Sequence, residues 1–135
     1  MSSYRVIPGL LSGQHIECND AAHHLRVNLL LVPLSPIQYQ LVKALLSQRQ
    51  RWEAELGQVP FLVSVSELQR VAGLRRRKDV KKQLWHANGQ LGRQALRAVS
   101  VHGYGYALFS LSELQPPVAL IGAAVPPGVE AGESG

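Results

Sequence analysis

Basic side chains are concentrated in one short segment of this sequence. Between Arg75 and Arg97 stand eight basic residues and one acid, Asp79, so this segment carries a charge of +7. The formal net charge of the chain is +5, so the other residues sum to −2. A cationic patch on a near-neutral body suits a polyanionic partner, because phosphates neutralised by Lys and Arg release condensed counterions. A solvated basic helix face is the alternative, and charge alone does not separate the two.

The spacing of apolar residues predicts a helix over residues 78–91, within this basic segment. Four apolar residues follow at spacings of four, three and four, which puts them on one stripe: Val80, Leu84, Ala87 and Leu91. Away from this stripe point cationic, aromatic and small residues: Lys78, Lys82, Trp85, His86 and Gly89. Such a helix suits a nucleic-acid groove, since cations reach phosphates and polar groups reach base edges. An ordinary amphipathic surface helix has the same pattern. Gly89 costs about 1 kcal/mol relative to Ala in a helix, so we expect bending or fraying near the end.

The other side chains that could bind a metal or take part in catalysis do not form a recognisable site. His15, Cys18, His23 and His24 are the candidates for zinc, but structural zinc sites usually hold two or more cysteines in paired spacing. We therefore expect ordinary surface histidines and no metal. His86 and His102 have no carboxylate or nucleophile near them in sequence, and phosphate-cradling glycine loops are missing. The sequence predicts neither an enzyme nor a cofactor.

Composition and periodicity predict the elements that carry the basic segment. At 135 residues and 46% hydrophobic, the chain has the size and composition of one folded domain. Residues 4–34 hold apolar runs split by turn residues, which predicts three or four short antiparallel strands. The runs are Arg5–Leu11, His15–Cys18 and Leu25–Val32.

Helix start signals follow. Ser35, Pro36 and Gln38 predict the start of a first helix that reaches Leu56 and stops at Gly57. After a short extended piece at 61–63, a second capping box, Ser64-x-x-Glu67, predicts a short helix that ends at Gly73.

Beyond the third helix, residues 98–109 alternate like a strand hairpin that turns at Gly103 and Gly105. We expect Tyr106 in the core, and we expect Trp52 and Trp85 to be buried anchors, with exposed stacking surfaces as the alternative. Residues 115–135 are rich in Pro, Gly and Ala, which predicts a disordered tail.

Four motifs occur in a fixed order along residues 20–110. They are Leu34-Ser35-Pro36-x-x-Tyr39-x-Leu41, then Val63-Ser64-x-x-Glu67-Leu68, then the stripe from Val80 to Leu91, and last Ser100-Val101-His102-Gly103-Tyr104-Gly105-Tyr106-Ala107-Leu108. Together they resemble the effector domain of OmpR/PhoB-type response regulators. The resemblance implies an α+β winged helix-turn-helix with an N-terminal antiparallel β-sheet, three helices and a C-terminal β-hairpin wing. Residues 1–34 would supply the N-terminal strands and residues 35–114 the winged helix-turn-helix.

The resemblance also implies a DNA-binding site. Family positions that read bases fall on Lys78, Lys82, Gln83, His86 and Asn88. Contacts to phosphate or from the wing fall on Arg75, Arg76, Arg77, Arg97, Ser100, His102 and Tyr104. Glutamine and asparagine can bind adenine in a bidentate way, and lysine reaches guanine acceptors. The wing glycines would allow a tight turn and a backbone close to DNA.

The function expected from this resemblance is sequence-specific binding of double-stranded DNA in bacterial transcription regulation, by a homodimer or by tandem copies. An architectural or adaptor winged helix, which binds protein or binds nucleic acid nonspecifically, is the alternative. RNA polymerase is a candidate partner, although about ten extra residues between the first two helices depart from the family's usual contact. No receiver domain is found, so control by phosphorylation does not carry over. With one cysteine, no secretory start and no apolar run long enough for a bilayer, we expect a cytoplasmic, nucleoid-associated protein without membrane contact.

Overall fold

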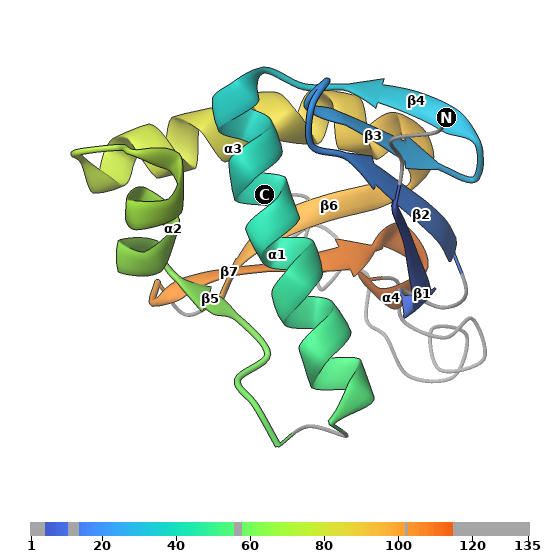
Figure 1. Cartoon of the computed structure of the whole chain (residues 1–135). Coiled ribbons are helices and arrows are strands. Elements are labelled where there is room, and N and C mark those ends of the chain that lie inside the picture. Colours follow the sequence, from blue (N-terminus) through green and yellow to red (C-terminus); the bar gives the residue numbers. More distant parts are fainter. Residues whose placement is uncertain (1–4, 11–13, 56–57, 102, 115–135) are drawn as a thin grey trace, which may run out of the picture.

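The N-terminal part of the chain forms a four-stranded antiparallel sheet (Figure 1). A computed structural model describes residues 5–10, 14–55, 58–101 and 103–114 of the chain. In spatial order the strands are β1 (Arg5–Leu10), β2 (Gln14–Asn19), β3 (His24–Val27) and β4 (Leu30–Pro33). Along β2 and β3, Ile16, Cys18, Leu25 and Val27 alternate and are buried, so one face of the sheet covers the core. The prediction of three or four antiparallel strands is confirmed.

The predicted apolar run Leu25–Val32 is two strands joined by a tight turn. Asn28 and Leu29 have φ values of 52° and 70°, as a type I′ hairpin turn requires. The Oδ1 atom of Asn28 accepts a hydrogen bond from the backbone N–H of His15 at 2.9 Å, which ties the turn to β2. Because the turn contains no glycine, it could not be recognised within the apolar run from the sequence.

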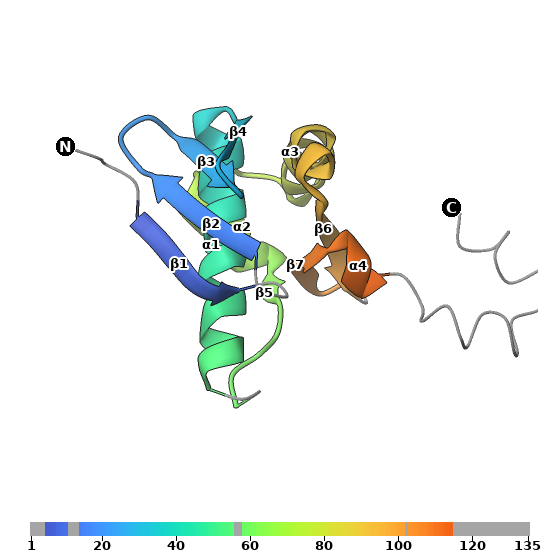
Figure 2. The same ribbon diagram turned by 90° about the vertical axis from the view of Figure 1, so that its right-hand side faces the viewer.

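Helix α1 (Pro36–Ala54) begins as predicted. The Ser35 Oγ accepts from the N–H of Gln38 at 3.1 Å, and the Gln38 side chain accepts from the N–H of Ser35 at 3.2 Å. This reciprocal pair satisfies two N–H groups that a helix start leaves open. The helix ends at Ala54, and the predicted terminal residues 56 and 57 lie outside the described residues. Figure 2 shows the four-stranded sheet beside α1, with α3 and strands β6 and β7 together to the right of them.

The next two helices are separated by four residues. Helix α2 (Val65–Ala72) is capped by Ser64, whose Oγ accepts from the N–H of Glu67 at 3.1 Å. It ends at Gly73, which has a φ of +68° and so adopts the left-handed conformation common after helices. Helix α3 (Arg77–Leu91) follows and continues through Gly89. A single 3₁₀ turn, η1 (Gly92–Gln94), leads into the second sheet.

The second sheet has three antiparallel strands in the order β5 (Val63–Ser64), β7 (Gly105–Ser110) and β6 (Leu96–Val101). A short helix, α4 (Leu111–Leu114), follows β7. Gly103 turns the β6–β7 hairpin with a φ of +74°. Gly105 has a role within the fold, because a Cβ there would lie 2.1 Å from the carbonyl oxygen of Val63. Its lack of a side chain lets β5 pair with β7.

Arg49 connects α1 to the second sheet from a buried position, with 5% of the residue exposed. Its guanidinium donates to the carbonyl oxygen of Leu108 at 3.0 Å, to Glu53 at 2.7 Å and to Glu113. Three aromatic rings surround the same group, with centroids at 5.1–6.0 Å: Trp52, Phe61 and Phe109. Arg49 thereby holds the β6–β7 hairpin at a fixed place relative to α1.

These elements make the described part of the chain an α+β fold with two antiparallel sheets around one buried cluster. Helix α4 and the turn η1 add to the three predicted helices. The predicted disordered tail, 115–135, lies outside the described residues, as does His102.

Candidate nucleic-acid interface

Helix α3 buries one stripe and exposes a cationic and aromatic face. The predicted stripe is confirmed, since Val80, Leu84, Ala87 and Leu91 are each at most 1% exposed. The residues on the opposite face are exposed: Lys78, Lys81, Lys82, Trp85, His86 and Gly89. Packing of the stripe against the core therefore fixes which side chains face solvent. We call this opposite face the α3 surface.

Arg77, the first residue of α3, lies close to the β6–β7 hairpin. Arg77 Nη2 donates to the carbonyl oxygen of Gly103 at 3.3 Å, which links the first turn of α3 to the hairpin turn. Arg76 pairs with Asp79 through two hydrogen bonds of 3.1 and 3.2 Å. This pair neutralises part of the charge of Arg76, whereas Arg75 is exposed just before it.

A groove of about 230 Å³ separates the start of α3 from the hairpin. Three cations and a hydroxyl line it, from Arg77, Lys78, Lys81 and Ser100, together with Val65, Gly103 and Tyr106. Burial raises the pKa of Tyr106, and the nearby Arg77 guanidinium only partly opposes this. Clustered cations beside a hydroxyl suit phosphate oxygens, which take hydrogen bonds from both kinds of donor.

A second hollow, of about 430 Å³, lies further along α3 beside β6. Its lining residues are Trp85, His86, Asn88, Gly89 and Arg97. Trp85 is 72% exposed, and its ring meets the His86 ring edge-on at 5.1 Å. The expectation that Trp85 is a buried anchor is therefore wrong, because its place on the helix faces away from the stripe. Trp52 is half-buried and packs on Phe61 at 4.7 Å.

Two of the predicted base-reading residues make contacts within the fold. Asn88 Nδ2 donates to the carbonyl oxygen of Ala98 at 3.0 Å, and its Oδ1 accepts from the N–H of Ala98 at 2.8 Å. This pair of hydrogen bonds joins α3 to β6 and engages the side-chain amide that was predicted to bind adenine. Gln83 is half-buried, and its Oε1 accepts from Gln38 Nε2 at 3.3 Å. We therefore remove Asn88 from the proposed base-reading set and give Gln83 a lesser part in it.

The other predicted residues are accessible. Lys78, Lys82 and His86 lie on the α3 surface, and Arg97, Ser100 and Tyr104 are exposed on β6 and the hairpin turn. His102 lies outside the described residues. The set omitted Lys81 and Trp85, although their places opposite the apolar stripe could have identified both.

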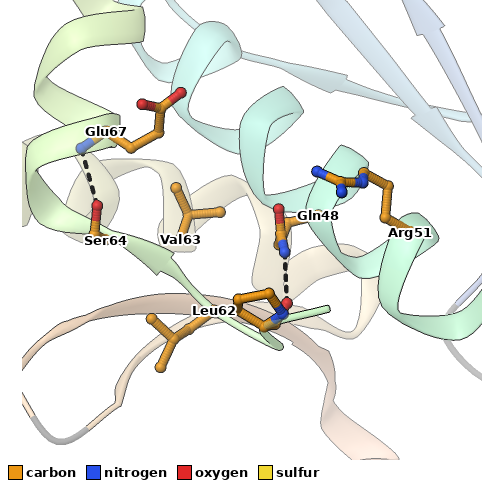
Figure 3. A pocket seen from close by; sticks show the side chains of 7 residues that line it. Gln48, Arg51, Leu62, Val63, Ser64 and Glu67 are labelled. Carbon is orange, nitrogen blue, oxygen red and sulfur yellow. Dashed lines mark hydrogen bonds between the residues drawn. The ribbon is translucent and has the colours of Figure 1, made fainter. Parts of the chain in front are cut away.

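A third pocket, of about 390 Å³, lies between α1, β5 and α2 (Figure 3). Gln48 donates there to the carbonyl oxygen of Pro60, and Ser64 caps α2. Arg51 and Glu67 also line it. Its polar groups thus serve the fold, and the residues that line it include no histidine or cysteine for nucleophilic or acid–base chemistry.

The histidines near Cys18 are scattered. Cys18 is buried in β2, whereas His15 is exposed and His23 packs edge-on against Tyr39 at 5.6 Å. Within the described ranges, no three His, Cys, Asp or Glu side chains are grouped so that they could hold a metal ion.

Comparison of the chain with protein-family models and with curated proteins finds no match. In the part of the chain that the structure describes, no helix combines the length and the apolar character needed to cross a membrane.

Proposed function

We propose that this chain is a winged helix-turn-helix protein of the OmpR/PhoB type that binds specific sites in double-stranded DNA. Helix α3 enters the major groove, and the β6–β7 hairpin acts as the wing on the minor groove or the backbone. The order of the elements supports this assignment, since a sheet, α1, β5, α2, α3 and a hairpin follow one another as in that family. Bacterial transcription regulation is the role that fits such a domain.

The observation that carries the proposal is the α3 surface. One face of a 15-residue helix is locked into the core by four apolar residues, and the other presents three lysines, a histidine and a tryptophan. A major groove about 12 Å wide admits such a helix. The cationic groove between α3 and the hairpin then lies where a phosphate backbone would run beside the inserted helix.

We assign the roles by position. Lys78, Lys82 and His86 are placed to reach base edges from the exposed face, while Arg77, Lys81 and Ser100 face phosphates from the groove. Arg75, Arg97 and Tyr104 extend the contact on either side. A single module of this size buries a small interface, so we expect a homodimer or tandem copies on repeated half-sites.

An adaptor that binds protein through the long first helix is the alternative. Two features of the sequence favour it: Trp52 on that helix and the Pro-rich tail. The Trp52 ring packs on Phe61 and on the Arg49 guanidinium, so it belongs to the fold, and the tail lies outside the described residues. The adaptor hypothesis keeps the pocket beside α1 as its binding surface, where RNA polymerase is one candidate partner. A protein partner gives a shallow dependence of affinity on salt, whereas several phosphate contacts give a steep one.

Selection from a random pool of double-stranded DNA tests the proposal. The wild-type chain should enrich one motif, and the variant Lys82→Ala with His86→Ala should enrich none. Arg51→Ala removes an exposed cation from α1, outside the α3 surface, and should return the wild-type motif. If no motif is enriched, or if the double variant enriches the same one, the assignment of α3 as a reading helix is wrong.

A further inference from the structure

Trp85 stands on the α3 surface without contributing to the core. The residue is 72% exposed, and its indole ring contacts the imidazole ring of the neighbouring His86. Burial of an indole ring is one of the larger apolar gains available to a fold, and an exposed ring forgoes it. The fold therefore leaves this ring available for a partner on the same face as Lys78 and Lys82.

Gly89 lies one helical turn after Trp85 and has no structural need to be glycine. It is in the middle of the last turns of α3, and a Cβ built on it meets nothing within 4 Å. Alanine would fit there and would favour the helix, because glycine is among the weakest helix formers. What glycine provides is room, since the hollow beside Trp85 is lined by Gly89 itself.

The groups around this hollow indicate what it can receive. The indole and imidazole rings form one wall, and the Arg97 guanidinium contributes a cation. Asn88 also lines it, but both atoms of its amide are engaged with Ala98. The hollow thus combines the apolar surface of the indole ring with a cation beside it. In the major groove, the apolar group that a base edge presents is the C5-methyl of thymine.

We propose that Trp85 reads a thymine methyl group, that Gly89 leaves room for it, and that Arg97 contacts the adjacent phosphate. This inference rests on the proposed function. It makes Trp85 a specificity-determining residue, and it predicts a thymine in the bound site opposite the second half of α3.

Uracil isolates the methyl group, because deoxyuridine pairs like thymidine and lacks only that group. We would replace the thymidines of a selected duplex with deoxyuridine one at a time and measure the affinity of each duplex. At one position the wild-type chain should lose about fourfold in affinity, which is the transfer free energy of one buried CH₂ group expressed as a ratio. Trp85→Ala should bind the two duplexes equally, and Trp85→Phe should keep part of the preference.

Gly89→Ala supplies the control for folding. It should melt at a higher temperature than wild type because of its helix propensity, and it should bind the thymidine duplex less tightly because the added methyl occupies the hollow. Equal wild-type affinity for thymidine and deoxyuridine at every position overturns the inference and leaves DNA binding intact. Persistence of the preference in Trp85→Ala shows that another residue reads the methyl, which also overturns it. A wild-type chain that binds no duplex overturns the proposed function and this inference together.

Discussion

Replacement of Arg49 by methionine should destabilise the fold far more than the same change at Arg51. The two residues lie on the same helix, but Arg49 is buried among Glu53, Glu113 and the carbonyl oxygen of Leu108. The side chain of Arg51 is 61% exposed, and its Nε lies 3.7 Å from the carboxylate of Glu55. Methionine keeps the length of the stem and removes only the guanidinium.

The magnitude follows from what the guanidinium leaves behind. Removal of one partner from a buried ion pair costs about 3–5 kcal/mol, because the other charge stays buried without compensation. The carboxylates of Glu53 and Glu113 keep 21% and 24% of their side chains exposed, so water restores part of the loss. We therefore expect about 3 kcal/mol for Arg49→Met. An exposed i,i+4 pair contributes about 0.3–0.5 kcal/mol, which is the cost expected for Arg51→Met.

Thermal unfolding followed by circular dichroism measures this difference. For a domain of this size, 3 kcal/mol corresponds to a fall in Tm on the order of 12 °C, whereas Arg51→Met should shift Tm by roughly 2 °C or less. Arg49→Met should also loosen the β6–β7 hairpin, which hydrogen exchange at β7 would report. If the two variants melt together within 2 °C, the guanidinium cluster is not the link between α1 and the second sheet.

Three further predictions concern the backbone and the pH dependence. Gly105→Ala should cost about 3 kcal/mol, because its Cβ would lie 2.1 Å from the carbonyl oxygen of Val63; a melting temperature equal to that of Gly92→Ala, where a Cβ meets nothing within 4 Å, would contradict this. Leu29→Gly should stabilise the chain by about 0.5–1 kcal/mol in denaturant unfolding, since Leu29 is 70% exposed and has a φ of 70°; a loss of stability would refute the reading of this turn as strained. Burial alone would raise the pKa of Glu113, but the hydrogen bond from Arg49 prevails and holds this pKa below its usual 4.5. The ionised Glu113 therefore stabilises the fold fully at neutral pH, and this contribution to the free energy of unfolding is lost as the pH falls below 4.5. The stability difference between wild type and Glu113→Gln should therefore shrink in acid, and a constant difference from pH 7 to pH 3 would count against it.

Local patterns in the sequence predicted the elements that carry the candidate site. The stripe from Val80 to Leu91 spans only twelve consecutive residues, so the buried side of α3 could be assigned without any tertiary contact. Ser35 and Ser64 act within four residues, and both were correctly predicted to cap helices. The strand count in the N-terminal region was also within reach, because the apolar runs are separated by turn residues.

Contacts between distant segments were not predictable in this way. Asn88 meets Ala98 only because β6 returns along α3 in one register, and no periodicity records that register. Gly105 fits the consensus of a wing, yet its need for glycine comes from Val63, more than forty residues earlier. The turn at Asn28 and Leu29 lacks the glycine that usually marks such a turn, so the residues around it look like one strand.

The salt dependence of affinity for double-stranded DNA tests the central claim most directly. Four cations are assigned to the DNA backbone: Arg75, Arg77, Lys81 and Arg97. If all four meet phosphates, log affinity should fall against log salt with a slope of about −3.6, and Arg77→Ala with Lys81→Ala should bring the slope to about −1.8. Arg51→Ala should leave it unchanged. Absence of binding at low salt, or a slope that the double variant does not alter, would contradict the account.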